Sequence, residues 1–489
     1  MGRVLARTVT HALVGLDARR VEVEAHLQSS VPAFAIVGLA DRACSEAKER
    51  VRSGISSAEL EWPLRRITVN LAPAGLRKEG SGFDLPIALS ILAASGQIPR
   101  ERLAEHSAVG ELALDGRLRP VGGVLALAEA ARHAGLPRIL CPASSAAEAA
   151  LAGIEPVPVR HLADAAAYLR GEREPEPWVE GNGHPPEEPL PDLSDVRGQE
   201  RARRALEIAA TGGHNLLLAG PPGTGKTMLA RRLPAILPPL STPEALEVTR
   251  IHSVAGMLSP DRPLITARPL RSPHYNVSVA ALVGGGPGPK PGEVSLAHRG
   301  VLVLDEFAEF QRPALEALRQ PLEDGLVSIA RVGGRATFPA RFQLVAAMNL
   351  CPCGARGDPA ADCKCSPQRL AAFRDKLSRA LLDRFDLVVA MPRPRAAELA
   401  APPGEESGAV RFRVSVGRQQ LEARRADWSK EATELLDRAV ERLPLSGRGR
   451  ARARRVAETI AALAGEPAVG ADHLAEALSY RPPTELSAR

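Results

Sequence analysis

Aromatic residues are scarce in this chain, at 3% of 489 residues. That scarcity argues against a protein that binds nucleic acid by stacking successive bases on exposed rings. Apolar runs long enough to cross a membrane are also missing, since the stretch Leu85–Ala94 is too short and contains Pro86 and Ser90. The N-terminus carries Arg3 and Arg7 but no apolar signal core. We therefore expect a cytoplasmic protein that does not enter a membrane.

Cysteine is also sparse, and its distribution is uneven. Four of the six cysteines lie within Cys351–Cys365. In a chain without an export signal, such clustering favours a metal site or reduced thiols over disulfides. The formal net charge of +6 is a weak indication of an anionic partner. A chain of 489 residues is too long for one compact core, so we expect several domains.

Changes in composition predict an α/β multidomain protein with four parts. Residues 1–170 alternate β-branched runs with alanine-rich helical patterns, which indicates an α+β or α/β domain. Residues 171–191 are rich in Pro, Glu and Gly and are predicted to be a linker. Residues 192–392 alternate fully apolar strands with helices, which predicts a parallel sheet covered on both faces. Residues 393–489 have helical patterns and predict a small all-α domain.

The same patterns predict individual elements. Strands are expected at Ile67–Leu71, Asn215–Ala219, Val301–Leu304 and Leu344–Met348. Helices are expected at Pro86–Ser95, Ala126–His133, Met228–Leu237, Glu431–Leu443, Ala451–Ala464 and Ala471–Leu478. The segment Gly284–Gly292 is so rich in Gly and Pro that we expect a mobile loop without any regular element.

A phosphate-binding loop is the strongest motif. Residues Gly220–Thr227 read GPPGTGKT and fit the pattern G-x-x-x-x-G-K-[ST] between one strand and one helix. Backbone N–H groups of such a loop bind phosphate together with the helix N-terminus. Lys226 is expected to reach the β- and γ-phosphates of ATP, and Thr227 to hold Mg²⁺. The other residues expected to cradle the nucleotide are Gly220, Pro221, Pro222, Gly223, Thr224 and Gly225.

Two carboxylates and an amide are expected beside this loop. Asp305 and Glu306 follow the apolar strand Val301–Leu304, and a neighbouring parallel strand would bring both to the mouth of the loop. There Asp305 would position Mg²⁺, and Glu306 would orient and deprotonate the attacking water. The alternative is that the pair only begins a helix. Asn349 ends the strand Leu344–Met348 and would help to hold the same water.

Two arginines complete the predicted site. Arg384 lies between apolar residues that would anchor a helix end, and we expect its guanidinium to contact the γ-phosphate held by a neighbouring subunit. An ion pair with Asp383 or Asp386 of the same chain is the alternative. Arg448, among several arginines at the start of the C-terminal helices, is the candidate sensor of nucleotide in its own chain.

Long segments of the chain resemble a known family. They are Val31–Ile55, Ile67–Pro99, Val109–Leu125, Arg197–Ala230, Arg271–Gly286, Pro291–Phe307 and Met348–Gly354. On these segments the chain is identified as a member of the magnesium-chelatase-like AAA+ ATPases, similar to their bacterial competence branch. The resemblance implies a Lon-protease-like α+β N-terminal domain, a AAA+ P-loop core and a C-terminal helical lid. It also implies a homo-oligomeric ring, a hexamer, that moves along DNA as a helicase and drives branch migration of recombination intermediates. Residues 411–431 depart from the family pattern, which puts the geometry leading into the lid in question.

The Lon-like segments lack the catalytic pair of that protease family. The stretch Lys78–Gly82 resembles the one that carries the catalytic serine, but Gly82 occupies the serine position and Leu125 that of the lysine base. A serine needs an adjacent base to become a nucleophile. We therefore expect a non-proteolytic scaffold or docking module, with Ser81 served by Lys78 as the alternative.

The clustered cysteines form the pattern C-x-C…C-x-C at Cys351, Cys353, Cys363 and Cys365. Four thiolates so close together suit a tetrahedral Zn²⁺ that would brace a loop. Four reduced cysteines without metal are the alternative.

Two basic segments are candidate DNA contacts. Ser328–Thr337 is predicted to be a hairpin in which Arg331 and Arg335 flank a glycine tip, and Lys290 lies in the glycine-rich loop. In a ring, both segments would project into the pore and bind phosphates without sequence preference. Charged hairpin tips are otherwise only solvated turns.

Three functions are compatible with these features. The first is an ATP-driven DNA motor for branch migration, as in natural transformation. The second is a chelatase-type ATPase subunit that assists metal insertion into a tetrapyrrole. The third is an ATP-dependent adaptor or degenerate Lon-like protein without DNA activity. As the resemblance implies, chelatase ATPase subunits lack the Lon-like domain and the paired C-x-C motifs, which favours the first.

Overall fold

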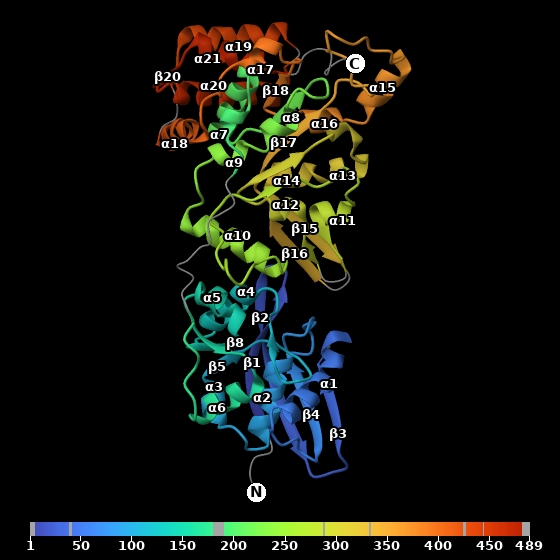
Figure 1. Ribbon diagram of the computed structural model, residues 1–489, viewed down its shortest axis with the longest axis vertical. Helices are drawn as coiled ribbons and strands as arrows, with labels where there is room; N and C mark the ends of the chain where they lie inside the picture. Colours follow the sequence, from blue (N-terminus) through green and yellow to red (C-terminus); the bar gives the residue numbers. More distant parts are fainter. Residues whose placement is uncertain are drawn as a thin grey trace.

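The computed structural model describes residues 5–38, 42–178, 190–286, 289–331, 334–423, 427–443 and 445–481. The molecule is elongated, with its N-terminal part (residues 5–178) at one end and its C-terminal helices at the other (Figure 1). Of the expected linker, residues 171–178 contain no helix or strand, and 179–189 lie outside the described residues. Across the described ranges, no helix is long and apolar enough to span a membrane. The divisions at residues 170, 191 and 392 remain predictions.

The N-terminal part is built on a mixed seven-stranded sheet in the order β3-β4-β2-β1-β5-β8-β9. The bounds are β1 Leu5–Val14, β2 Asp17–Gln28, β3 Ala33–Val37, β4 Arg66–Ala72, β5 His106–Ala108, β8 Arg138–Pro142 and β9 Glu155–Val159. Three expected elements are confirmed as β4, α2 (Asp84–Ala94) and α4 (Val124–His133). Helix α2 is buried along its whole length because it is apolar on every side. Its one charged residue, Asp84, pairs with Arg50 (2.6 Å).

The core contains a five-stranded sheet in the order β11-β14-β17-β10-β18, and all its strands are parallel. The bounds are β10 Leu216–Ala219, β11 Leu270–Arg271, β14 Val301–Leu304, β17 Gln343–Met348 and β18 Leu387–Ala390. Leu216 and Leu218 pack in one apolar cluster, whereas Leu217 and Ala219 pack in another. Successive residues of a strand face opposite sides of the sheet. The predicted parallel sheet, covered on both faces, is therefore confirmed.

The helix after the phosphate-binding loop differs from expectation. A single helix at Met228–Leu237 is wrong, because the chain forms α8 (Lys226–Ala230) and α9 (Leu233–Ile236) with a break between them. Pro234 lies in the first turn of α9. Proline has no N–H, and its ring crowds the carbonyl four residues earlier, so a regular helix cannot continue through it.

The C-terminal helices are α18 Ser407–Ala423, α19 Lys430–Arg442, α20 Gly447–Leu463 and α21 Ala471–Ser479. The last three confirm the predicted helices, but α18 was missed. Val410, Val414 and Gly417 of α18 are buried at helical spacing. A Cβ on Gly417 would lie 2.8 Å from Cγ2 of Thr211 in α7 (Glu200–Gly212), so glycine permits close helix packing. Glycine and β-branched residues have low helix propensity, and tertiary packing forms this helix instead. A two-residue parallel ladder of β19 (Asp427–Trp428) with β20 (Ala468–Val469) also lies in this part, which is therefore not purely helical.

Two hairpins of the core lie beside the N-terminal part (Figure 1). Their bounds are β12 Gly284–Gly285 with β13 Lys290–Pro291, and β15 Leu326–Arg331 with β16 Gly334–Pro339. The second confirms the predicted hairpin, although its tip residues 332–333 lie outside the described ones. The first corrects the expectation of no regular element. Gly284 has φ +104°, and a Cβ there would lie 2.6 Å from the Lys290 carbonyl oxygen, so this pairing needs glycine.

The N-terminal part contacts the core through α10 (Thr242–Val254) and the second hairpin. The N–H of Gly123 donates to the Ser253 carbonyl oxygen (3.0 Å), and the Ser253 hydroxyl donates to Glu148. A Cβ added to Gly15, in the turn between β1 and β2, would lie 3.2 Å from the Ala336 Cβ of the hairpin. The turn and the hairpin are therefore in direct contact.

Candidate nucleotide-binding site

The predicted phosphate-binding loop follows β10 and leads into α8. Lys226 is buried, and its Nζ donates to the carbonyl oxygens of Gly220 (2.8 Å) and Pro221 (2.6 Å). Nζ also donates to Asn349 Oδ1 (3.3 Å). Burial lowers the pKa of this lysine, and the Asp305 charge partly offsets the effect. These contacts hold the ammonium inside the loop, where a phosphate would be bound.

Glycine is required in the loop for two different reasons. Gly223 and Gly225 have φ values of +78° and +88°, a region that side chains disfavour. Gly220 has no such φ, but a Cβ there would lie 2.2 Å from the Met391 carbonyl oxygen. The loop conformation and its packing under β18 therefore both depend on the glycines of the motif.

The predicted magnesium residues lie together. Thr227 Oγ1 donates to Asp305 Oδ2 (2.8 Å), and Asp305 Oδ1 accepts from the N–H of Glu306 (2.9 Å). Strands β14, β17 and β10 are adjacent and parallel, so Asp305, Asn349 and the loop all follow strand ends on one edge of the sheet. Hydroxyl and carboxylate oxygens are ligands that Mg²⁺ prefers. The residues present therefore fit a magnesium site at this edge.

The four clustered cysteines lie beside the same loop. Their Sγ atoms all lie within 4.8 Å of one another, with 3.7 Å between Cys351 and Cys363. A tetrahedral zinc with Zn–S bonds of about 2.3 Å places its sulfur atoms about 3.8 Å apart, so the cluster fits this metal. A hydrogen bond from the backbone of Ala355 is the main cause that lowers the pKa of the Cys353 thiol to about 6, whereas burial is the main cause that raises the pKa of the Cys351 thiol. A Cβ on Gly354 would lie 3.1 Å from Pro222, so the cysteine loop packs directly on the phosphate-binding loop.

Arg384 lies at the opposite end of the sheet. Its carbonyl oxygen accepts from Asn215 Nδ2 (3.1 Å), just before β10 begins, whereas the phosphate-binding loop follows the end of that strand. Its guanidinium pairs with Glu323 of α14 (Arg319–Asp324). An ion pair within the same chain is therefore present, as in the alternative, but its partner is Glu323 rather than Asp383 or Asp386. Those carboxylates pair with Arg452 (3.6 Å) and Arg455 (3.1 Å) respectively.

Arg448 lies near Arg384 rather than near the nucleotide loop. Its guanidinium is 3.5 Å from the same Glu323 carboxylate. Helix α20, which carries Arg448, begins at the end of the sheet opposite the phosphate-binding loop. To sense nucleotide in its own chain, Arg448 would have to reach that loop at the other edge of the sheet. The structure places Arg448 with Arg384, and its assignment as a sensor of nucleotide in its own chain stays a prediction.

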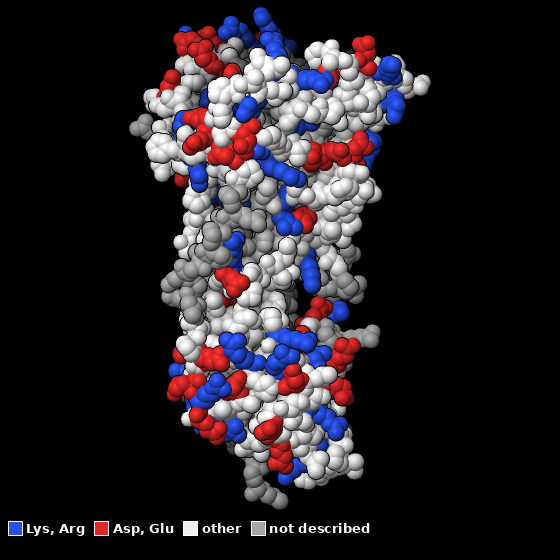
Figure 2. Space-filling model, in the orientation of Figure 1, with Lys and Arg blue, Asp and Glu red and all other residues white. Residues whose placement is uncertain are grey.

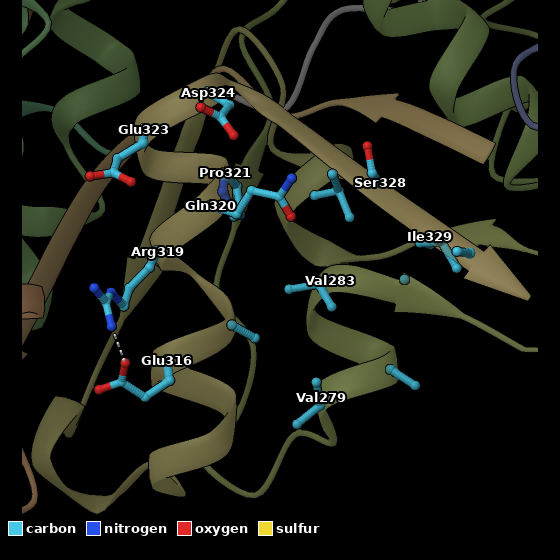
Figure 3. Close-up of a pocket in the computed structure, with 15 residues that line it drawn as sticks. Val279, Val283, Glu316, Arg319, Gln320, Pro321, Glu323, Asp324, Ser328 and Ile329 are labelled. Atoms are coloured by element: carbon cyan, nitrogen blue, oxygen red, sulfur yellow. Dashed lines mark hydrogen bonds and ion pairs between the residues drawn. The ribbon is translucent and has the colours of Figure 1, made fainter. Parts of the chain in front are cut away.

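Glu323 also lines a hollow of about 840 Å³. Figure 3 shows it between α11 (Val279–Val283), α14 and β15, with Val279 and Val283 on one side and Glu323 and Asp324 on another. Its Glu316 and Arg319 pair with each other (3.1 Å). None of the predicted nucleotide residues lines this hollow, which belongs to the face that carries Arg384.

The predicted DNA contacts lie far along the core from the nucleotide loop. Lys290 and Arg335 are exposed, and neither has an ion pair among the described residues. Arg331 lies at the end of β15, and its side chain is outside the described ones. Figure 2 shows basic and acidic side chains intermixed at both ends of the molecule, so the net positive charge forms no single basic face in this view.

The segment predicted to resemble Lon proteases places an acid against its serine. Ser81 Oγ donates to the Glu111 carboxylate, and Lys78 is fully buried with its Nζ donating to the Pro73 carbonyl oxygen. Ser81 is therefore hydrogen-bonded to an acid, and Lys78 donates a hydrogen bond to the backbone. Leu125 is buried in α4, as its apolar side chain requires.

Sequence reasoning missed two residues that contact these groups. Gln199 Nε2 donates to the Thr224 carbonyl oxygen (3.3 Å) in the phosphate-binding loop and to that of Pro392 (2.7 Å). Glu323 is the partner of both arginines. No spacing in the sequence signals either, because each contact joins residues that are distant along the chain.

Comparisons with known proteins agree with the arrangement of the core. The family described as magnesium chelatase, subunit ChlI, matches residues 192–399, and its C-terminal family matches residues 404–481. The family described as subunit ChlI of Mg-chelatase matches residues 23–145. Together these matches extend from the first sheet to the last helix.

Similar proteins come from several bacteria. An uncharacterised protein of Mycobacterium tuberculosis is 47% identical, and the match covers 98% of each chain. The competence protein ComM of Haemophilus influenzae is 41% identical over 98% of this chain and 97% of its own length. The 38 kDa magnesium-chelatase subunit of Rhodobacter capsulatus is 29% identical over 60% of this chain and 88% of that subunit. The chain therefore belongs to the magnesium-chelatase-like family that includes the competence protein ComM.

Proposed function

We propose that this protein is a ring-forming, ATP-dependent DNA motor that promotes branch migration of recombination intermediates. The observation that carries the proposal is the separation of its catalytic parts. The phosphate-binding loop and the carboxylates lie at one edge of the core sheet, whereas Arg384 lies at the other. An arginine that stabilises charge on the γ-phosphate then has to come from a second copy of the chain.

Hydrolysis in this proposal uses groups that already lie together. Thr227 and Asp305 hold the Mg²⁺ that accompanies ATP and neutralises charge on its phosphates. Lys226 exchanges its bonds to loop carbonyls for bonds to phosphate oxygens. Glu306 is exposed beside Asp305 and accepts a proton from the attacking water, which Asn349 helps to orient.

The ring is proposed to place Arg384 at a neighbour's γ-phosphate. In the single chain its Nε is buried without a hydrogen-bond partner among the described residues, and Glu323 neutralises its charge. Approach of a neighbour's nucleotide would supply an anion that competes with Glu323. Arg448, close to the same carboxylate, is then placed to sense that neighbour's nucleotide rather than its own. A hexamer is the assembly that the family resemblance favours.

DNA is proposed to be held by Lys290, Arg331 and Arg335 on the two core hairpins. Lys290 and Arg335 are exposed and have no ion pair within the described ranges, so they are available to phosphates, and such contacts carry no sequence preference. The similarity to ComM, a competence protein, over nearly the whole chain supports this role.

The four cysteines are proposed to bind a structural zinc. The N-terminal part is proposed to be a Lon-protease-like scaffold without proteolytic activity.

A chelatase-type ATPase subunit is the second candidate. The similarity to a magnesium-chelatase subunit supports it, but that match covers only 60% of this chain. The match to ComM covers 98%, which favours the DNA motor.

The deciding measurement is ATP turnover with and without single-stranded, forked and four-way-junction DNA. We expect DNA to stimulate hydrolysis, and the protein to move a junction only when ATP is present. Turnover and assembly that are unchanged by DNA of any form would reject the motor and leave the chelatase-type or adaptor function.

A further inference from the structure

A cavity of about 820 Å³ lies between the N-terminal part and the two core hairpins. Its N-terminal wall includes the end of β1 and residues 75–77, 79–83 and 120–122, whereas the core contributes Lys290 and Arg335 among others. Cavities that hold small ligands measure about 300–1,000 Å³. The residues of the phosphate-binding loop do not line it, so it is separate from the ATP site.

His11 on β1 is the unusual residue of this cavity. Its side chain lines the cavity and is only 5% exposed. Both ring nitrogens are buried without a hydrogen-bond partner among the described residues. Burial, reinforced by the charge of Arg20, lowers the pKa of His11 to about 4, so the ring is neutral. A neutral imidazole offers one donor and one acceptor, and leaving both unsatisfied destabilises the folded protein.

Another buried histidine of the same sheet shows the ordinary arrangement. His106 of β5 is fully buried, and its Nδ1 lies 2.6 Å from the Arg102 carbonyl oxygen. Its Nε2 lies 2.9 Å from the Tyr168 hydroxyl. Both nitrogens of this ring are therefore satisfied. His11, in contrast, lies at the wall of a cavity with both ring nitrogens lacking a partner among the described residues.

The rest of the lining defines the chemistry of that partner. Leu13, Val109, Val121 and Leu127 contribute apolar walls, and the ion pair of Arg77 with Glu79 (2.8 Å) also lines the cavity. On the core side, Lys290 and Arg335 are exposed cations without ion pairs among the described residues. A fitting ligand therefore has a flat apolar body, polar atoms at its edge and a negative group outside.

We propose that the cavity binds one nucleotide unit, with its base between the apolar walls and hydrogen-bonded to His11, and its phosphate at Lys290 and Arg335. The unit belongs either to a DNA strand or to a free nucleotide. The DNA source rests on the proposed function. The N-terminal part then forms one wall of the DNA path instead of acting only as a scaffold.

The test compares His11→Leu with the matched control His106→Leu. Binding of three probes is measured on protein saturated with ADP, so that the ATP site is occupied: single-stranded oligodeoxythymidine, an abasic oligonucleotide of the same length, and thymidine monophosphate. We expect His11→Leu to weaken binding of the base-bearing strand by about five- to tenfold, and to leave the abasic strand unaffected. The Lys290→Ala/Arg335→Ala variant weakens binding of both strands.

Stability gives an independent readout. His11→Leu removes two unsatisfied polar atoms, so its Tm should rise by about 2–4 °C, whereas His106→Leu breaks two hydrogen bonds and should lower it. His106→Leu should not change binding. Should His11→Leu fail to fold, Val121→Phe fills the cavity instead and must weaken binding of the base-bearing strand.

The outcomes separate this proposal from the proposed function. If the parent protein binds both strands equally, or if His11→Leu binds the base-bearing strand like the parent, the nucleotide pocket is refuted while DNA binding stands. Buried water then satisfies His11. If only thymidine monophosphate binds, and does so through His11, the pocket is supported and the DNA source is refuted. If none of the probes binds, both proposals fail.

Discussion

Glu306 has a left-handed backbone conformation, with φ of +52°. Residues other than glycine rarely adopt it, and it costs some free energy. The turn follows β14 directly and is held by the bond from the Glu306 N–H to Asp305. It separates the two carboxylates, because Asp305 faces Thr227 while Glu306 stays exposed. In the proposed function, Asp305 would thereby hold the metal, and Glu306 would act on water.

Removing the charge of Glu306 alone tests this division of roles. The Glu306→Gln variant should bind ATP with normal affinity, since the amide has the same shape, but turnover should fall by about 10²–10⁴-fold. Phosphate release and binding of a fluorescent ATP analogue measure the two effects. The control is Glu309→Gln, an exposed neighbour that pairs with Lys376 (3.1 Å), which should keep its turnover. Normal hydrolysis by Glu306→Gln would assign the base to another residue.

His214 links β10 to α20 and makes stability depend on pH. Its Nε2 lies 2.8 Å from Thr459 Oγ1. Burial lowers its pKa to about 4, and Asp386 partly opposes the shift. The unfolded chain binds this proton with a pKa of about 6.5, so its contribution to stability is present above that pH and is lost as pH falls towards 4.

We expect this histidine alone to reduce the free energy of unfolding by about 2 kcal/mol between pH 7 and pH 5. Urea unfolding of the parent and of His214→Gln at both pH values measures it. The variant should show a smaller decrease than the parent, whatever its absolute stability. Equal decreases would mean that His214 is not buried as a neutral group.

At the scale of elements, the sequence predicts those helices and strands whose own residues carry a hydrophobic pattern, and it does not predict contacts between distant elements. The strands β10, β14 and β17 could be predicted, since burial on both faces requires an unbroken apolar run. Because these strands are parallel neighbours, the phosphate-binding loop, the Asp305–Glu306 pair and Asn349, which follow their ends, meet at one edge of the sheet. Helix α18 could not be predicted because its buried face contains Gly417, and glycine is unfavourable in a helix. This glycine is explained only by its close contact with Thr211 of another helix. The partner of Arg384 could not be predicted either, because Glu323 comes from another element and no periodicity connects them.

The cysteine loop is predicted to stabilise the phosphate-binding loop through a metal. Purified protein should contain about one zinc per chain, the number that four thiolates satisfy. The Cys351→Ser/Cys353→Ser variant should lose the zinc and weaken ATP binding, since Gly354 packs on Pro222. Elemental analysis and nucleotide titration measure these effects. Cys141→Ser, at a buried cysteine outside the cluster, is the control and should keep the metal. A fully active preparation without metal would contradict the structural role.

The hairpin β15–β16 is predicted to couple DNA to hydrolysis without taking part in it. Arg331→Ala/Arg335→Ala should lose DNA-stimulated turnover and junction movement, yet keep basal turnover, because the hairpin lies away from the nucleotide loop. Binding by the parent should weaken steeply with salt and ignore sequence, and each lost phosphate contact should reduce the salt slope by about one. A double mutant that moves a four-way junction as fast as the parent would exclude the hairpin from DNA binding.

At the scale of the whole molecule, the proposed function requires the proposed catalytic groups to act between chains. The nucleotide loop and Arg384 lie at opposite edges of one parallel sheet, so one chain presents a nucleotide on one side and an arginine on the other. Such a head-to-tail arrangement generates a ring when its rotation closes. The hollow beside Glu323 lies on the arginine side and would be part of the same contact.

Mixing two inactive variants tests this arrangement directly. Lys226→Ala cannot bind ATP but keeps Arg384, whereas Arg384→Ala binds ATP but lacks the arginine. Neither should turn over ATP alone, because loss of such an arginine costs about 10³–10⁵-fold in rate. A mixture should recover activity, since an ATP-loaded Arg384→Ala subunit receives the arginine of a Lys226→Ala neighbour. Recovery also shows that both variants are folded, which matters because Arg384 is nearly buried and paired with Glu323. Parent turnover per chain should also rise with protein concentration, because each active site needs the arginine of a second chain.

An Arg384→Ala variant that is folded, binds ATP and hydrolyses it normally would place the arginine outside catalysis. Two folded variants that restore nothing when mixed would mean that each chain completes its own site.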